Sequence, residues 1–325
     1  MENPLLEVIG LSTHFVTYRG QRVVKAVDNL SFRVSEGETV ALIGESGCGK
    51  TTTALSILGV LPPAARIVAG KIILDGENIL EKSPKYMSQV IRGKKVCMIP
   101  QDPMSSLDPV FTIEDQTAEP LRLHQNLRPP ALVERITELL RWVKISAPES
   151  RLKQYPHQLS GGMRQRVVGA ISLAGVPKLL IADEPTTNLD VTVQAQYLAL
   201  LREIQEKTGL GILFVTHNLG IVAKLCTYVV VMYAGKAVEK APTIDLFDQA
   251  AHPYSRALIM AIPKIGDKEK IVPIEGQPPD LANLPPGCSF YPRCPVRLER
   301  CAHEEPPETE SGESRTVRCW VAQGV

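Results

Sequence analysis

The sequence carries almost no surplus of charge of either sign, with 36 Lys and Arg residues against 35 Asp and Glu residues. A protein that binds DNA or RNA needs a basic surplus to neutralise phosphates, so this balance argues against a nucleic-acid partner. Long hydrophobic runs are also missing: apolar stretches such as residues 228–234 fall far short of the roughly 20 residues that span a bilayer. Any role at a membrane must therefore depend on partner subunits.

A secretory signal is missing from the first residues, MENPLLEVIG, which contain acidic Glu2 and Glu7 and lack a long apolar core. We therefore expect the chain in the cytoplasm. Its seven cysteines would then lie in a reducing compartment, where clustered thiols bind metal more often than they form disulfides. No internal repeat of fixed period is present, which excludes a solenoid or a propeller as the first interpretation.

Hydrophobic patterning in the first part of the chain predicts short strands, then a strand, a loop and a helix. Apolar runs at 23–27 and 30–34, with turn-forming glycines nearby, are typical of short strands. Residues 39–43 are β-branched and apolar, a glycine-rich stretch follows, and residues 51–58 have helical spacing. This order of elements is the one that a phosphate-binding loop requires.

The middle of the chain changes from a helical pattern to alternating strands and helices. Residues 84–175 are mainly helical in pattern, with apolar residues at 132, 133, 136, 139, 140 and 143, and we interpret them as a helical insert. Strand patterns at 179–182 and 211–215 are separated by an amphipathic stretch at 193–205, which is the order of a β-α-β unit. We therefore predict an α/β core with a mostly parallel sheet.

Proline breaks up the end of the chain. Prolines at 273, 278, 279, 285, 286, 292, 295, 306 and 307 interrupt any long helix or strand. We predict a main domain over residues 1–245, with a helical subdomain over about 84–175, and a small loop-rich appendage over 246–325.

The run GESGCGKT at residues 44–51 matches the phosphate-binding pattern G-x-x-x-x-G-K-[ST] in full. Its glycines let backbone N–H groups and the following helix N-terminus point at a phosphate. Lys50 would add a positive charge, Thr51 a hydroxyl for Mg²⁺, and Thr52 a hydroxyl for the α-phosphate. A glycine-rich turn that binds nothing is the alternative, and the complete motif disfavours it. The candidate nucleotide ligands are Gly44, Ser46, Gly47, Cys48, Gly49, Lys50, Thr51 and Thr52.

Two carboxylates follow the apolar strand pattern at 179–182. Ligands bind at the carboxyl ends of strands in open α/β sheets, so Asp183 and Glu184 are placed for chemistry. We expect Asp183 to hold Mg²⁺ and Glu184 to orient or deprotonate the attacking water. A solvated acidic loop is the alternative, and the upstream phosphate-binding motif weakens it.

The run LSGGMRQR at residues 159–166 resembles the signature motif of the ABC ATPase family. Ser160 resembles a helix N-cap, and Gly161 and Gly162 leave backbone N–H groups bare, which makes a second anion site; a merely capped helix is the alternative. The resemblance implies a P-loop NTPase core of the RecA-like type, with an antiparallel β subdomain and a helical subdomain. It also implies that each ATP lies between the P-loop of one subunit and the signature of another.

The remaining family motifs occur in the expected order. Gln101 matches the Q-loop, TNLD at 187–190 matches the D-loop, and His217 matches the switch histidine. The resemblance implies that Gln101 contacts Mg²⁺ together with Thr51 and Asp183, and that His217 contacts the γ-phosphate or the water. It also places Asp190 at the subunit interface.

An aromatic residue near the N-terminus usually stacks on adenine in this family. Phe15 aligns best with that residue, and Tyr18 is the second choice. A phenylalanine at a strand end is also commonly part of a core.

A narrower resemblance is to the ATPases of bacterial dipeptide and oligopeptide importers. It rests on QDPMSSLDP at 101–109, on Met163, on HPY at 252–254 and on a cysteine-rich tail. It implies a second ATPase chain, two transmembrane permease subunits, an extracytoplasmic solute-binding protein and a place on the cytoplasmic face of the membrane. Nickel or another solute is an alternative cargo. A soluble ABC ATPase of DNA repair or translation is a further alternative, but the coiled-coil insert or second cassette of such proteins is missing.

Cys288, Cys294, Cys301 and Cys319 are separated by five, six and seventeen residues, with no C-x₂-C pair. Spacing alone leaves structural Zn²⁺, an iron–sulfur cluster and no metal open. The resemblance to importer ATPases whose tails hold a [4Fe–4S] cluster favours the cluster. Four thiolates could then stabilise a segment too small for a core of its own.

Overall fold

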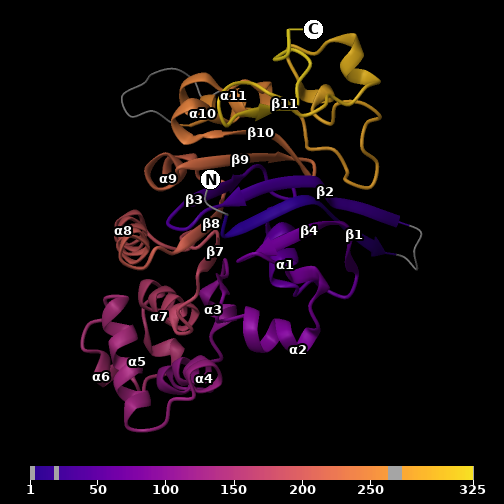
Figure 1. Cartoon of the computed structure of the whole chain (residues 1–325). Coiled ribbons are helices and arrows are strands. Elements are labelled where there is room, and N and C mark those ends of the chain that lie inside the picture. The colour runs from indigo at the N-terminus through magenta and orange to yellow at the C-terminus, as the bar shows by residue number, and fades with distance from the viewer. Residues whose placement is uncertain (1–3, 18–21, 263–272, 325) are drawn as a thin grey trace. The chain divides into compact units, whose positions relative to one another are not determined.

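The computed structural model describes residues 4–17, 22–262 and 273–324 of the chain. The chain divides into two compact units, shown with their element labels in Figure 1. Unit 1 is mainly Glu81–Leu213, and unit 2 consists of Leu6–Val34, Glu38–Leu80 and Phe214–Val325. The predicted appendage at 246–325 and the phosphate-binding motif therefore belong to the same compact unit. The domain boundary at 245 remains a prediction.

Unit 2 contains an antiparallel sheet with the strand order β2-β1-β4-β5. Its strands are β1 (Leu6–Thr17), β2 (Arg22–Val34), β4 (Ala65–Leu74) and β5 (Glu77–Asn78). The two short strands predicted at 23–27 and 30–34 are one continuous strand, β2. The register between β1 and β2 shifts next to Asn29, whose φ of 53° lies in the left-handed region that asparagine tolerates. A bulge thus replaces the predicted break.

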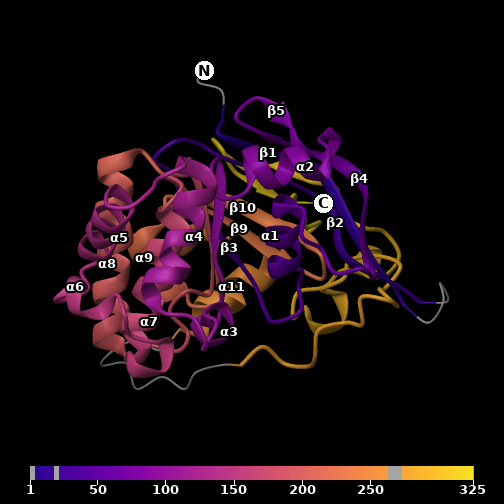
Figure 2. The same ribbon diagram turned by 90° about the horizontal axis from the view of Figure 1, so that it is seen from below.

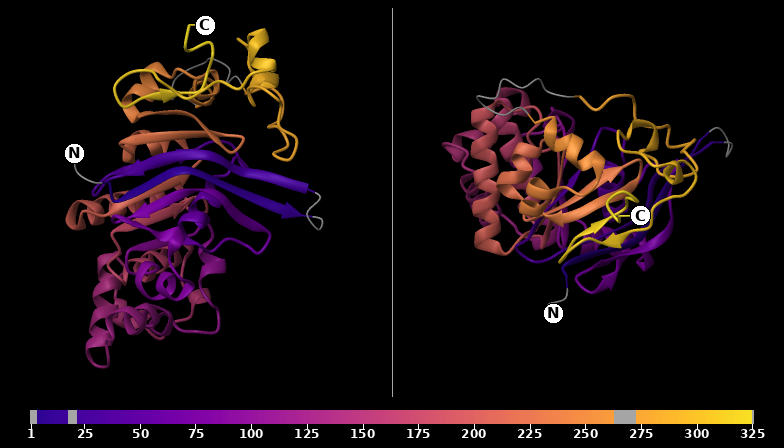
Figure 3. Two further views of the ribbon diagram at one scale, coloured as in Figure 1. Left: turned by 45° about the vertical axis from the view of Figure 1, so that its right-hand side comes forward. Right: turned by 90° about the horizontal axis from the view of Figure 1, so that it is seen from above.

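A second group of strands in unit 2 carries the phosphate-binding motif. The strand order is β11-β12-β10-β9-β3, in which β3 (Thr39–Ile43) is fully buried and parallel to β9 (Tyr228–Tyr233). β10 (Lys236–Pro242), β11 (Thr309–Glu310) and β12 (Thr316–Val317) are antiparallel to their neighbours. Figure 3 shows the yellow C-terminal strands beside the orange strands β9 and β10. The described part of unit 2 contains the α-helices α1 (Lys50–Leu58), α9 (Leu219–Leu225), α10 (Thr243–Gln249) and α11 (Pro253–Met260).

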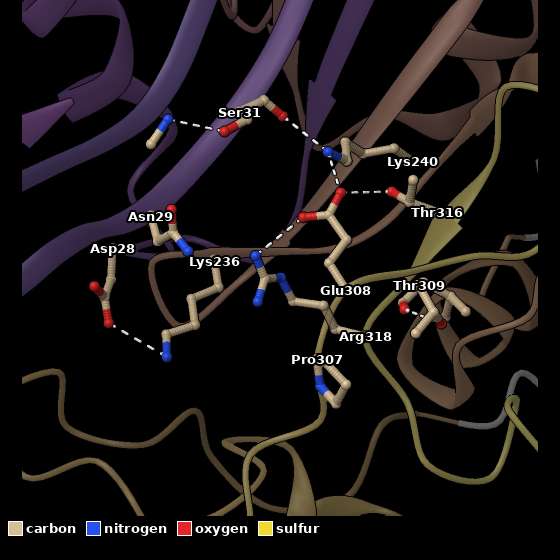
Figure 4. A network of polar contacts seen from close by, with 12 residues as sticks. Asp28, Asn29, Ser31, Lys236, Lys240, Pro307, Glu308, Thr309, Thr316 and Arg318 are labelled. Carbon is tan, nitrogen blue, oxygen red and sulfur yellow. Dashed lines mark hydrogen bonds and ion pairs between the residues drawn. The ribbon is translucent and has the colours of Figure 1, made fainter. Parts of the chain in front are cut away.

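A polar network anchors the C-terminal segment within unit 2 (Figure 4). The carboxylate of Glu308 accepts hydrogen bonds from Lys240, from Thr316 Oγ1 at 2.8 Å and from Arg318 Nη2 at 3.0 Å. Lys240 also donates to the carbonyl of Ser31 on β2 at 3.1 Å. Burial opposes ionisation of Glu308, but the bonds and charges of Lys240, Thr316 and Arg318 outweigh it and lower its pKa. Ionised Glu308 thereby joins the tail to both sheets of unit 2.

Unit 1 combines a parallel strand pair with a bundle of helices. β6 (Val96–Ile99) and β7 (Leu179–Asp183) are parallel, and the pairwise contacts among α4 (Ile113–Gln125), α5 (Ala131–Trp142) and α7 (Gly161–Leu173) form the bundle. Figure 2 shows these helices grouped with α6 (Pro148–Arg151). Unit 1 also contains the α-helices α2 (Pro84–Tyr86), α3 (Pro103–Ser106) and α8 (Val191–Thr208), and the chain passes into unit 2 within β8 (Gly211–Thr216).

The helical spacing predicted at 132–143 is confirmed, because Leu132, Ile136, Leu139 and Leu140 of α5 are all buried. One part of the prediction for 84–175 needs correction. β6 lies inside that range and pairs with β7, because its four residues are too few to show a strand pattern in a mostly helical stretch. The predicted α/β class and the predicted antiparallel sheet are confirmed, and the sheet that contains β3 is mixed rather than mostly parallel.

Within the described part of the chain, every helix is too short or too polar to cross a bilayer.

Candidate functional site

Three glycines of the phosphate-binding loop adopt backbone conformations that other residues rarely reach. Gly44, Gly47 and Gly49 have φ angles of 148°, 80° and 106°. A Cβ atom on Gly44 would lie 2.2 Å from the carbonyl oxygen of Met232, and one on Gly49 would lie 2.2 Å from that of Ala26. The loop can therefore follow this path only with glycine at these two positions.

The loop leads into the N-terminus of α1, which is open to an anion. Gly49 is the N-cap and offers no side-chain oxygen to the first turn, and that turn contains no acidic residue. Thr51 is exposed and Thr52 is half-exposed in the same turn, and Ser46 and Gly47 are exposed before it. Phosphate oxygens accept hydrogen bonds from N–H groups and hydroxyls at the positive N-terminus of a helix.

Lys50 is almost buried, with 6% of its surface exposed. Its ammonium donates to the carbonyl oxygens of Gly44 at 2.8 Å and Glu45 at 3.0 Å. The ammonium also lies 3.7 Å from Sγ of Cys48. Burial raises the pKa of the Cys48 thiol although Lys50 favours the thiolate, so Cys48 is a neutral packing residue of the loop.

In unit 1, Glu184 follows the end of β7 with a φ of 46°, which is an unusual backbone conformation for a residue other than glycine. One carboxylate oxygen, Oε2, accepts from Gln101 Nε2 and from Thr187 Oγ1, both at 3.1 Å. Asp183, the last residue of β7, is 3% exposed. The structure thus brings together Gln101, which was predicted to contact Mg²⁺, and Glu184, which was predicted to act on the attacking water.

The contact of Thr187 with Glu184 was not predicted from the sequence. Thr187 is part of the D-loop motif at 187–190. The signal in the sequence for this contact is that Thr187 lies three residues after Glu184, close enough for its hydroxyl to donate to the carboxylate.

The signature residues begin α7 in unit 1. Ser160 is the N-cap, and its Oγ accepts from the N–H of Met163 at 3.3 Å. A Cβ on Gly162 would lie 2.6 Å from a methyl of Val193 in α8, whereas one on Gly161 would meet nothing within 4 Å. Gly162 is therefore required for helix packing, and the space beside Gly161 is open.

Asp190 of the D-loop is the N-cap of α8. Its Oδ1 accepts from the N–H groups of Thr192 at 3.0 Å and Val193 at 2.9 Å. Helix capping alone is a sufficient reason for an acidic residue at this position, and no bound ligand is needed to explain it. Its predicted place at a subunit interface remains a prediction.

His217 is exposed directly after β8, and the next residue, Asn218, caps α9. Phe15 is half-exposed on β1, opposite Val24 of β2 and Ala65 of β4. Tyr18, the second candidate for stacking on adenine, lies outside the described residues. A strand residue with a partly exposed ring can present a face to a base, so Phe15 remains the candidate.

The four tail cysteines, Cys288, Cys294, Cys301 and Cys319, line one cavity, together with the ring of Trp320. Burial raises the pKa of Cys288 to about 11, with the neighbouring thiols adding to the effect, and it also raises the pKa of Cys294 and Cys319. Within the described ranges, no three His, Cys, Asp or Glu side chains converge closely enough to hold a single ion. Cysteine thiols are the ligands of iron–sulfur clusters, so the donor chemistry of this cavity is compatible with the predicted cluster, which stays a prediction.

Models of two protein families match the chain. "ABC transporter" matches residues 27–187, and "Oligopeptide/dipeptide transporter, C-terminal region" matches residues 238–301. The dipeptide transport ATP-binding protein DppD of Bacillus subtilis is 46% identical over 319 residues, which are 98% of this chain and 94% of DppD. The chain belongs to the family of dipeptide and oligopeptide transport ATP-binding proteins. The oligopeptide transport ATP-binding protein AppD of the same organism is also 46% identical, over 98% of this chain and 96% of AppD.

Solved structures of two other proteins are similar to this chain in fold. A dimeric ATP-binding cassette in a post-hydrolysis state with ADP and phosphate is similar in fold, with a TM-score of 0.65, 22% identity and coverage of 73% of this chain and 98% of that one. The structure of cbiO1 from Clostridium perfringens has a TM-score of 0.64 at 26% identity, over 76% of this chain and 92% of cbiO1. The chain is an ABC ATPase and a subunit of an ABC transporter.

Proposed function

We propose that this chain binds Mg-ATP and hydrolyses it to power the import of dipeptides or oligopeptides through partner membrane subunits. The observation that carries the proposal is the 46% identity with DppD, a dipeptide transport protein, over 98% of the chain. The match of residues 238–301 to the C-terminal region of oligopeptide and dipeptide transporters supports the same class of cargo.

The loop at 44–51 supplies the phosphate site in this proposal. Backbone N–H groups from Ser46 to Thr52 surround the β-phosphate, and Lys50 exchanges its two carbonyl acceptors for phosphate oxygens. Mg²⁺ would be held by Thr51, through its exposed hydroxyl, and by Asp183 and Gln101. Phe15 stacks on the adenine ring. Mg²⁺ supplies charge stabilisation for the transferred phosphoryl group when it is bound.

Hydrolysis in this proposal depends on Glu184. Its carboxylate orients and deprotonates the attacking water, and Gln101 and Thr187 fix its orientation through their hydrogen bonds to Oε2. The exposed ring of His217 contacts the γ-phosphate or the water. The positive φ of Glu184 fits a residue whose placement matters more than its local stability.

A second ATPase chain completes each nucleotide site in this proposal. The open N-terminus of α7, with Ser160, Gly161 and Gly162, binds the γ-phosphate of the ATP held by the partner, and Asp190 lies at the same interface. The chain works with two permease subunits and an extracytoplasmic solute-binding protein, and it lies on the cytoplasmic face of the membrane. The partner ATPase is either an identical chain or a paralogue.

The test of the cargo is uptake by whole cells that lack this chain. We expect uptake of labelled di-, tri- and tetrapeptides to fall to background and to return with the wild-type chain but not with Lys50→Ala. Nickel uptake is measured in the same cells. Unchanged peptide uptake together with lost nickel uptake would assign the chain to a different cargo.

We further propose that one [4Fe–4S] cluster is held by Cys288, Cys294, Cys301 and Cys319. The cluster cross-links the C-terminal segment and takes no part in hydrolysis. The support is that the four thiols line one cavity. Thiols with raised pKa values release their protons when metal binds, so assembly is expected to weaken at low pH.

Chain purified without oxygen is expected to be brown, to absorb broadly near ~400 nm and to contain about four irons. Cys301→Ser should lose most of the iron, whereas Cys226→Ala, which removes a buried thiol elsewhere, should keep it. Colourless protein with one zinc per chain would replace the cluster by the alternative metal.

A further inference from the structure

Glu45 of the phosphate-binding loop makes polar contacts through its carbonyl, its N–H and its carboxylate. Its carbonyl accepts from the Lys50 ammonium at 3.0 Å. Its N–H donates to the hydroxyl of Tyr254 at 2.9 Å. Its carboxylate forms a bidentate ion pair with Arg293, with distances of 2.6 and 3.0 Å. Glu45 therefore links the lysine of the loop to α11 and to the C-terminal segment.

Arg293 is held as firmly as its partner. Only 3% of its side chain is exposed, and its Nε donates to the carbonyl of Glu275 at 2.9 Å. Nη1 also lies 3.4 Å from the hydroxyl of Tyr233, whose ring the guanidinium faces at 5.8 Å. A buried cation with a fixed bidentate acceptor is a strong positional constraint, because leaving it unpaired is unfavourable. Arg293 directly precedes Cys294, so the constraint begins in the cysteine-containing segment.

Tyr254 is fixed by an aromatic cluster. Its ring centroid lies 4.7 Å from that of Tyr233 and 5.4 Å from that of Phe290, and all three residues are buried. Phe290 belongs to the C-terminal segment and Tyr233 ends β9. The hydroxyl that accepts from Glu45 therefore cannot follow the loop if the loop moves.

We propose that Arg293 and Tyr254 are positioning residues for nucleotide binding, through which the C-terminal segment holds the phosphate-binding loop in its binding conformation. This inference rests on the proposed function. A loop already held in its curled form has less conformational freedom to lose when phosphate binds, so the two contacts raise ATP affinity. The coupling is reciprocal: bound ATP stabilises the C-terminal segment to the same degree that the segment favours ATP.

The first test is the equilibrium affinity of the full chain for ATP. Arg293→Met and Glu45→Gln are each expected to weaken ATP binding about tenfold, and the double variant should be no weaker than either single variant, because both remove one contact. Arg297→Met is the matched control: it removes an exposed arginine four residues further along the same segment, and ATP affinity should not change. Effects that add in the double variant, or an unchanged affinity of Arg293→Met, would overturn the proposal.

A second variant keeps the test valid if Arg293→Met does not fold. Tyr254→Phe deletes only the hydroxyl, leaves the aromatic cluster filled and is expected to weaken ATP binding about threefold. Saturating ATP should also slow proteolysis of the segment after Pro273 in the wild-type chain and protect it less in Tyr254→Phe. Equal affinity and equal protection in the two chains would refute the coupling. Failure of the wild-type chain itself to bind ATP would refute the proposed function instead.

Discussion

Replacing Glu184 by Gln is expected to lower steady-state ATP hydrolysis by the assembled transporter by about two to three orders of magnitude, with ATP affinity close to that of the wild type. The amide has nearly the same shape, and its oxygen can still accept from Gln101 and Thr187. It cannot take a proton from water at neutral pH, so the loss falls on the chemical step. Steady-state phosphate release and equilibrium ATP binding measure the two effects separately.

The matched control for this substitution is Glu206→Gln on α8. Glu206 is exposed and pairs with the exposed Arg202 at 3.1 Å, so the same change of charge and shape occurs away from the acidic strand end. Hydrolysis by the control should equal that of the wild type. Hydrolysis by Glu184→Gln within twofold of the wild type would remove Glu184 from its assigned role.

Local patterns predicted much of the fold. The apolar positions of α5 were predicted by helical spacing, and β3, α1 and β7 by apolar runs around glycines and carboxylates, because each signal lies within one short window. The strand β6 could not be recognised in the sequence, because it has only four residues and lies inside a stretch with a mainly helical pattern. The bulge at Asn29 was read as a break between two strands, because the sequence shows the irregularity but not the pairing that continues across it.

Contacts between distant parts of the sequence could not be predicted in this way. Glu45 and Arg293 are 248 residues apart, and no periodic pattern relates them. In the pairing of β12 with β10, Glu239 lies opposite Val317 and Lys240 lies opposite Thr316. β12 has two residues, which are too few to form a strand pattern that could be recognised in the sequence. Glu45 stands at an unspecified position of the G-x-x-x-x-G-K-[ST] pattern, so the motif predicts no role for it. Its carboxylate acquires a partner only when the C-terminal segment folds beside it.

The remaining prediction concerns Lys50. Lys50→Ala is expected to weaken ATP binding by about 30- to 150-fold, since a charge-assisted hydrogen bond contributes about 2–3 kcal/mol and no other cation in the loop at 44–51 can replace it. The loss should depend on the number of phosphates: large for ATP, smaller for ADP and absent for adenosine, because the ammonium is assigned to β- and γ-phosphate oxygens. Calorimetric titration with the three ligands measures this series.

Lys224→Ala on α9 is the control, because it removes an exposed lysine from the same unit. Its affinities should match those of the wild type for all three ligands. Lys50→Ala also leaves the carbonyls of Gly44 and Glu45 without the ammonium donor, so circular dichroism must show that the variant is folded before its affinities are compared. An equal loss for ATP and adenosine would mean that Lys50 supports the loop as a whole, whereas an undiminished ATP affinity would show that the phosphates are bound without it. A loss graded with the phosphate chain is the result that only a direct contact between Lys50 and the phosphates produces.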